Sequence, residues 1–152
     1  MNTAITITRE NLTITTDQSL FDFDKIYNFI SGKSYWAEGI PMEILKRSVE
    51  NSLSFGLFCD KEQIGFARVV TDYATFGYLA DVFIDEKFRG RGLSLWLMET
   101  IFAHADLKGL RRWLLATRDA HGLYEKFGFK GLSKPERMME IVNADIYKPI
   151  PE

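Results

Sequence analysis

The sequence is poor in cysteine and proline and has no long apolar run. Of its 152 residues, one is cysteine and four are proline. A single cysteine excludes a disulfide framework or a cysteine-based zinc cluster within one chain, and it is typical of a reducing compartment. No stretch approaches the roughly 20 apolar residues of a membrane helix, and residues 1–17 lack the features of a secretory signal. We therefore expect a cytoplasmic protein without a membrane partner.

An excess of charge of either sign is also absent. Lysine and arginine number 19 against 21 acidic residues, which gives a formal net charge of −2. A general nucleic-acid binder needs a broad basic face, so we expect no nucleic-acid partner. Hydrophobic residues make up 46% and charged residues 26% of the chain, as is typical of a globular protein. The length predicts a single domain over residues 1–152.

The spacing of apolar residues switches between strand and helix periods along the chain. Alternation over 4–8 and 12–15 predicts a hairpin or one bent strand. Apolar residues at helical spacing predict a helix from Leu20 that ends at Gly32, and a second helix after Pro41. Further strands are predicted at 53–59, 64–71, 78–84, 110–116 and 137–143, with helices at 93–105 and 119–127.

This order of elements predicts an α/β fold. The strand, helix and strand between residues 78 and 116 imply a right-handed crossover and a parallel strand pair. The two strands of 53–71, joined by a short turn, imply an antiparallel pair. We therefore expect a mixed sheet with helices on both faces.

The most informative segment is the charged turn 87–94, KFRGRGLS, between a buried strand and a buried helix. Free backbone N–H groups and the positive end of the helix dipole favour an anion there. Gly90 and Gly92 permit a positive φ and the close approach of a phosphate. The turn carries three cations, Lys87, Arg89 and Arg91. A bound polyanion would offset the conflict between these cations and the dipole; a turn with solvated charges is the alternative.

The turn also carries a family motif. Arg89, Gly92 and Ser94 fall on the fixed positions of the pattern R/Q-x-x-G-x-G/A, with Ser94 in place of Gly or Ala, whereas the Walker and dinucleotide-binding patterns do not fit. Here the chain resembles the GNAT superfamily of N-acetyltransferases, in which this turn holds the diphosphate of acetyl coenzyme A. The resemblance implies cofactor contacts from Val82, Phe83, Ile84, Arg89, Gly90, Arg91, Gly92, Leu93 and Ser94.

A second motif lies at 115–129, LATRDAHGLYEKFGF. It resembles the GNAT pattern N-x-x-A-x-x-L-Y-x-x-x-G-F, with Ala120 and Tyr124 among the matching positions. Thr117 stands where Asn is usual, and it is a further cofactor-binding candidate. The resemblance implies a GNAT-like sheet that is mixed and mostly antiparallel, with a splayed, parallel central strand pair that binds pantetheine.

Acetyl transfer requires a neutral amine, a polarised thioester oxygen and a proton for the departing thiolate. Tyr124 falls on the family's general acid, and a Tyr pKa of about 10 keeps it protonated at neutral pH. The resemblance places the oxyanion donor at the backbone N–H of Val82 or Phe83. For the general base three candidates stay open: Asp81, whose apolar strand favours a raised pKa, Glu38 and ordered water. Structural roles are the alternatives for Tyr124 and Asp81.

The acceptor side is expected in the loop between the first two helices. Tyr35, Trp36 and Glu38 lie there, and in GNAT folds this region faces the acceptor together with the loop that contains Tyr73. Exposed aromatics beside a carboxylate suit a cationic amine; packing of these aromatics on the core is the alternative. We expect a small amine, or an amine of a peptide or protein, as acceptor.

Together these patterns predict an acetyl-CoA-dependent N-acetyltransferase that uses direct transfer in a ternary complex. A non-catalytic acyl-CoA-binding regulatory module on the same fold is the alternative. A toxin that acetylates aminoacyl-tRNA is a third reading, and the net charge of −2 disfavours it. His104 and His121 lack the spacing of metal ligands, so no metal is expected. The resemblance also suggests a homodimer, because homodimers are common in this superfamily.

Overall fold

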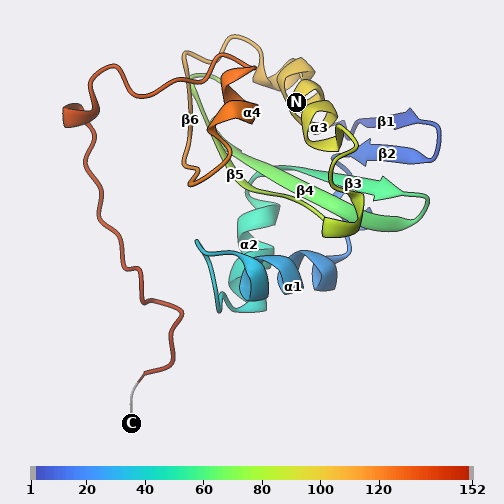
Figure 1. The fold of residues 1–152 in the computed structure, drawn as a ribbon, viewed down its shortest axis with the longest axis horizontal. Helices are drawn as coiled ribbons and strands as arrows, with labels where there is room; N and C mark the ends of the chain where they lie inside the picture. Colours follow the sequence, from blue (N-terminus) through green and yellow to red (C-terminus); the bar gives the residue numbers. More distant parts are fainter. Residues whose placement is uncertain (1–2, 151–152) are drawn as a thin grey trace.

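The computed structural model describes residues 3–150. A six-stranded sheet forms its centre, and strands that follow one another in the sequence are neighbours in the sheet (Figure 1). The strands are β1 (Thr6–Arg9), β2 (Leu12–Thr15), β3 (Leu53–Cys59), β4 (Glu62–Thr71), β5 (Phe76–Ile84) and β6 (Arg112–Leu115). The helices are α1 (Phe23–Lys33), α2 (Met42–Glu50), α3 (Leu93–Ala103) and α4 (His121–Glu125).

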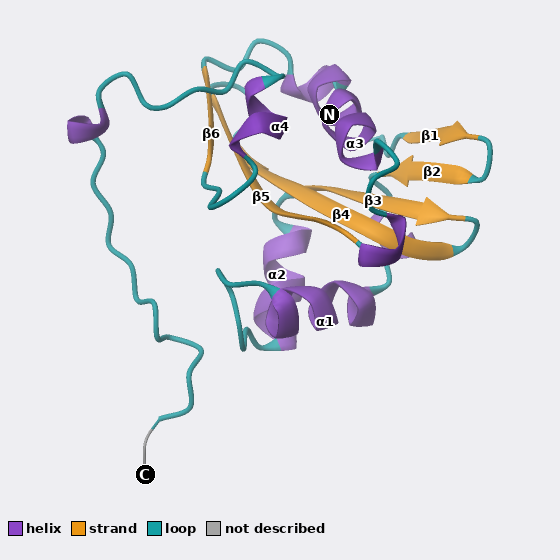
Figure 2. Ribbon diagram, in the orientation of Figure 1, coloured by secondary structure: helices purple, strands orange, loops and turns teal. Residues whose placement is uncertain are grey.

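The helices cover both faces of the sheet, which confirms the expected layers. Figure 2 shows α1 and α2 on one face and α3 and α4 on the other. Alternate residues of a strand point to opposite faces, so the sheet contributes to two cores. Phe55 and Leu57 pack in the core beneath α3, whereas Phe58 and Phe66 pack against α1 and α2.

Local capping explains why the first helix begins later than the apolar spacing predicts. Asp22 is its N-cap and accepts a hydrogen bond from the backbone N–H of Lys25 at 3.0 Å, a favourable interaction for an otherwise unpaired N–H. Leu20 lies before this cap, in a single 3-10 turn, and is exposed. The buried face of α1 is formed by Ile26 and Ile30.

All strand pairs are antiparallel except β5 and β6, which are parallel as predicted. Their pairing runs from Phe76 with Arg112 to Leu79 with Leu115 and ends there. Strand β5 continues to Ile84, so the side of its second half that faces away from β4 has no neighbouring strand in the described chain. The pairing ends at Leu115, the last residue of β6, and this leaves an open side along the second half of β5.

The strand predicted at 137–143 is wrong. A 3-10 turn occupies Pro135–Arg137, and residues 138–143 are exposed, irregular chain that runs outside the domain (Figure 1). Alternating apolar residues favour a strand only where a neighbour completes the hydrogen bonds, and this segment has none within residues 3–150. Consequently the parallel pair lies at one edge of the sheet and not at its centre. Within the same residues, no helix combines the length and apolar character needed to cross a bilayer.

Candidate active site

The turn between β5 and α3 has the conformation that its glycines predict. Gly90 and Gly92 have φ values of 80° and 75°, a left-handed region that glycine enters without strain. Gly92 is the N-cap of α3, and no side chain caps this helix. The first N–H groups of α3 therefore remain available to an external acceptor, and together with the helix dipole they form a site suited to a phosphate.

Charged side chains make three contacts in and next to this turn. The Lys25 ammonium lies 2.6 Å from the Asp85 carboxylate, and this hydrogen bond is the main cause that lowers the Asp85 pKa. The Arg89 Nε donates to the carbonyl of Ile84 at 3.1 Å, which ties the turn to the end of β5. The Arg91 guanidinium lies 5.1 Å from the centre of the Phe88 ring. Both arginines are exposed and sit beside the N-terminus of α3.

The unpaired side of β5 presents backbone groups to the gap between β5 and β6. The N–H of Asp85 donates to Ile64 of β4 at 2.7 Å. Because backbone groups alternate in direction along an antiparallel strand, the N–H of Phe83, opposite Phe66, also points to β4, while that of Ile84 points away from it. The carbonyl oxygen of Ile84 also points away from β4, because it accepts a hydrogen bond from Arg89.

A β-bulge distorts β5 beside this gap. Phe66 is opposite Phe83 and Arg68 is opposite Ala80, so two residues of β5 face one of β4. Asp81 is one of these two residues, and its φ is 56°. A left-handed conformation is uncommon for a residue with a side chain and needs support from its surroundings.

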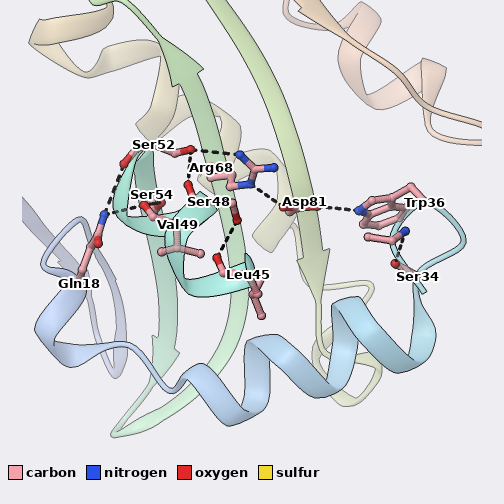
Figure 3. Close-up of polar contacts among 11 residues, drawn as sticks. Gln18, Ser34, Trp36, Leu45, Ser48, Val49, Ser52, Ser54, Arg68 and Asp81 are labelled. Carbon is pink, nitrogen blue, oxygen red and sulfur yellow. Dashed lines mark hydrogen bonds and ion pairs between the residues drawn. The ribbon is translucent and has the colours of Figure 1, made fainter. Parts of the chain in front are cut away.

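Asp81 is held by two donors from different parts of the fold (Figure 3). Its Oδ2 accepts from Arg68 Nε at 2.5 Å, and its Oδ1 accepts from Trp36 Nε1 at 2.6 Å. Arg68 also donates to the Ser52 hydroxyl at 3.1 Å. The Asp81 side chain is 7% exposed, so its charge is neutralised by Arg68 out of contact with bulk water. The apolar strand thus contains an ion pair and not an isolated carboxylate.

The loop that follows α1 closes over the gap. Trp36 binds Asp81 on β5, and the Tyr35 hydroxyl accepts a hydrogen bond from the backbone N–H of Arg118, beyond β6, at 3.0 Å. The loop therefore bridges β5 and the segment that follows β6. Both aromatic rings are exposed, yet one face of Tyr35 is already covered by the Arg118 guanidinium at 4.0 Å. A cationic acceptor on that face would have to displace Arg118.

Tyr124 lies on α4, close enough to Tyr35 of this bridge to be influenced by it, and the residue is 8% exposed. Burial raises the Tyr124 pKa to about 12, with smaller contributions from Tyr35 and Asp119. Within residues 3–150 no buried side-chain oxygen lacks a hydrogen-bond partner, so the Tyr124 hydroxyl, which has no partner there, retains access to the hollow that Tyr124 lines. Thr117 is nearby, and its hydroxyl accepts from the N–H of Ala120 at 3.0 Å. This hydrogen bond orders the entry to α4, so Thr117 has a structural role beside any cofactor contact.

Two predicted acceptor residues lie away from this site. Tyr73 is at the opposite end of β5, where burial, and secondarily Asp106, raise its pKa. Glu38 is exposed and lies close to Lys148, whose pKa is raised mainly by its hydrogen bond to Asp145 and to a smaller extent by Glu38. Residues 3–150 bring together no three His, Cys, Asp or Glu side chains suited to a metal ion.

Sequence reasoning missed Arg68 and Arg118. Arg68 lies within the run IGFARVV of β4, and a lone arginine in an apolar strand signals a buried partner. That signal could have suggested an ion pair with Asp81. Arg118 had no such signal, because its contacts with Tyr35 depend on how the loops meet.

The comparison with protein families decides the identity of this fold. A model described as the acetyltransferase (GNAT) family matches residues 23–129, which include β3 to β6 and both motifs. The chain belongs to the GNAT acetyltransferase family. It is accordingly an acyltransferase, and the family that the turn 87–94 and the segment 115–129 predict is confirmed.

Individual relatives are consistent with this family assignment. A crystal structure from Xanthomonas campestris pv. campestris, described as an acetyltransferase of the GNAT family, is 46% identical, covers 91% of this chain and 97% of its own, and superposes with a TM-score of 0.89. A Gibberella zeae protein named as an acetyltransferase is 30% identical over 93% of this chain and 92% of its own length. A Clostridium acetobutylicum structure with acetyl-CoA is 17% identical and shares the fold, with a TM-score of 0.60 over 87% of this chain and 95% of its own.

Proposed function

We propose that this GNAT enzyme transfers an acetyl group from acetyl-CoA to a primary amine by direct attack. The observation that carries the proposal is the position of Tyr124. Tyr124 is a buried residue that lines a hollow beside β6, and its protonated hydroxyl lies near Tyr35 of the aromatic bridge. The anion-binding turn at Gly92 lies at the far end of β5. A diphosphate at one end and a proton donor near the other suit a long acyl-CoA.

The fit of coenzyme A rests on features of this chain. The uncapped N-terminus of α3, between Gly90 and Leu93, offers backbone N–H groups to the diphosphate, with Arg89 and Arg91 beside it. The unpaired N–H groups of β5 offer partners to the amides of pantetheine. Acetyl-CoA supplies a thioester, whose carbonyl carbon forms the new bond to nitrogen as the C–S bond breaks.

Two groups of the chain act on that exchange. Of the two candidate donors to the developing charge on the thioester oxygen, Phe83 directs its N–H to β4, so we assign this role to the N–H of Val82. Tyr124 donates its proton to the departing thiolate. Tyrosine regains this proton from solvent because its pKa, about 12, favours the protonated form.

Ordered water is our preferred base for the incoming amine. Both carboxylate oxygens of Asp81 are already engaged, by Arg68 and Trp36, so proton uptake would break one of these bonds. Glu38 is exposed and lies close to Lys148. Asp81 instead positions Trp36 and the aromatic loop, which forms the acceptor side of the site with Tyr35.

A panel of amines tests the proposed activity. We expect release of free thiol from acetyl-CoA, measured by a thiol reagent, with at least one small amine, amino acid or lysine peptide. Binding of CoA by calorimetry without thiol release from any amine would favour the acyl-CoA-binding module. Absence of CoA binding would contradict both functions.

Replacement of Gly92 by Ala tests the anion site. An alanine in the left-handed conformation costs about 1–2 kcal/mol. We therefore expect one of two results: a loss of stability of that size, or a rotated backbone that weakens CoA binding about tenfold, which corresponds to about 1.4 kcal/mol. Gly122→Ala is a matched control, because an added Cβ meets nothing within 4 Å at either position and Gly122 lacks a positive φ. Unchanged stability and unchanged CoA affinity in Gly92→Ala would contradict the anion site. Calorimetry and chemical denaturation measure the two effects.

A further inference from the structure

The side chain of Arg118 is held in place by the aromatic loop. Its Cζ lies 4.0 Å from the centre of the Tyr35 ring, and the Arg118 backbone N–H donates to the hydroxyl of the same tyrosine at 3.0 Å. A cation over an aromatic ring is attracted by the negative face of the ring. These two contacts therefore order an arginine that is otherwise exposed at the surface.

Stacking occupies the face of this guanidinium and leaves its edge unused. The N–H groups of an arginine lie in the plane of the guanidinium and point outward from its edge. Within the described chain, this edge forms no hydrogen bond and no ion pair. Arg68, by contrast, directs its N–H groups at Asp81 and Ser52. Arg118 thus presents an ordered fork of donors to an external group, and a carboxylate accepts from such a fork through two parallel hydrogen bonds.

This fork lies in the part of the site where the acceptor is expected. The Tyr35 ring contacts Trp36 edge to face, with 5.0 Å between the ring centres, and Trp36 binds Asp81 of β5 (Figure 3). Burial is the main cause of the raised Tyr124 pKa and Tyr35 is the next, so these two tyrosines lie close together. Arg118 therefore belongs with the aromatic loop and the proposed acid, whereas the anion-binding turn begins beyond the end of β5.

The charges around this fork favour an anion over a cation. Asp81 is paired with Arg68, so it offers no net negative charge to an acceptor. Asp119 is exposed and forms no ion pair with Arg118 among the residues that the structure describes. A positive charge near the acceptor also lowers the pKa of its ammonium group, which favours the neutral amine that the attack requires.

We propose that Arg118 binds a carboxylate of the acceptor, and that the acceptor is therefore an amino acid or another small amine with a carboxylate group. This inference rests on the proposed acetyl transfer and adds the substrate class to it. An acceptor held by its carboxylate keeps its amine free to attack the thioester. Tyr35 then serves to order Arg118, in place of binding a cationic group of the acceptor with its ring.

Matched pairs of acceptors test this assignment. Each amino acid of a panel is assayed beside its carboxamide, which has nearly the same shape without the negative charge. We expect kcat/KM for thiol release to be at least about tenfold higher for the amino acid, because a charge-assisted bidentate contact supplies such a difference. The carboxamide has the less basic amine, so protonation of the amine does not produce this preference. Equal kcat/KM within every pair would overturn the role of Arg118 and leave the proposed acetyl transfer intact.

Substitution of Arg118 tests the contact directly. Arg118→Gln is expected to raise KM for the amino acids at least about tenfold while kcat stays within about twofold, as for a contact that the substrate and the transition state share. KM for the carboxamides should not change. Arg118→Lys should recover only part of the lost affinity, because it restores the charge without the fork. Arg47→Gln is the matched control, since Arg47 is also an exposed arginine but lies on α2, and it should match wild type.

Calorimetry with CoA separates this role from a contact with the cofactor. Arg118→Gln is expected to bind CoA within about twofold of wild type, because the diphosphate site lies at a distance, and circular dichroism should show it folded. Weaker CoA binding, or an equal rise in KM for amino acids and carboxamides, would place Arg118 at the cofactor or in the support of the fold and refute the proposal. Thiol release from no amine at all, with CoA bound, would instead contradict the acetyl transfer on which the proposal rests.

Discussion

Replacing Tyr124 by Phe is expected to lower kcat for acetyl transfer by about 10²–10⁴-fold, the usual contribution of a positioned proton donor. The variant removes the hydroxyl and keeps the ring that packs against Phe129 at 6.1 Å. Affinity for CoA is therefore expected to stay within about twofold, since binding at the turn is distant from the hydroxyl. Steady-state kinetics with an amine identified in the panel, together with calorimetry, separate the two quantities.

Tyr27→Phe is the control for this variant, because Tyr27 lies on α1 and packs against the core on the other face of the sheet. It is expected to keep the wild-type kcat. Equal turnover of Tyr124→Phe and wild type at saturating amine would remove Tyr124 as the acid.

The pH dependence follows from the raised pKa. Because the Tyr124 pKa is about 12, the acid stays protonated from pH 7 to 10, and the kcat ratio of wild type to Tyr124→Phe should be constant over that range. In the unfolded chain a tyrosine ionises near pH 10. The burial of the neutral phenol therefore stabilises the fold fully below about pH 10 and loses this effect as pH rises toward 12. Denaturation of both proteins across that range measures the loss.

The parts of this fold that the sequence predicts are those set by local pattern. Two motifs of contiguous residues identify the turn at Gly92 and the helix that carries Tyr124, because their spacing depends on one strand–helix connection each. The positive φ of Gly92 follows from the absence of a Cβ. The mixed sheet and the parallel pair follow from the order of elements alone.

What the sequence does not predict depends on contacts between distant segments. The environment of Asp81 depends on Arg68 in a neighbouring strand and on Trp36, 45 residues away, so its apolar sequence neighbours suggest an isolated carboxylate. The arm at 137–143 has the alternation of a strand, yet a strand forms only where an edge is in reach. Alternation specifies which side chains share a face and leaves the pairing partner open.

Replacing Asp81 by Asn is expected to lower the free energy of unfolding by about 3–5 kcal/mol, because it leaves the Arg68 guanidinium without its counter-charge in a buried site. Asn tolerates the left-handed φ of 56° better than most residues, so the loss reports the missing charge and not backbone strain. Urea denaturation measures it. Stability equal to wild type would contradict a structural role for the ion pair.

The double variant Arg68→Met with Asp81→Asn is the matched control, since it removes both charges and should regain part of the stability lost by either single variant.

The variants Asp81→Asn and Trp36→Phe separate the two roles open to Asp81, positioning of Trp36 and general base. If Asp81 positions Trp36 through the 2.6 Å hydrogen bond to its indole, both Asp81→Asn and Trp36→Phe raise KM for the amine. The acidic limb of the pH profile of kcat/KM then stays as in wild type for both variants. If Asp81 is instead the general base, that limb disappears and kcat falls in Asp81→Asn but not in Trp36→Phe. Because the Trp36 contact can be removed without altering the carboxylate, the pair of profiles assigns the role of Asp81 independently of its effect on stability.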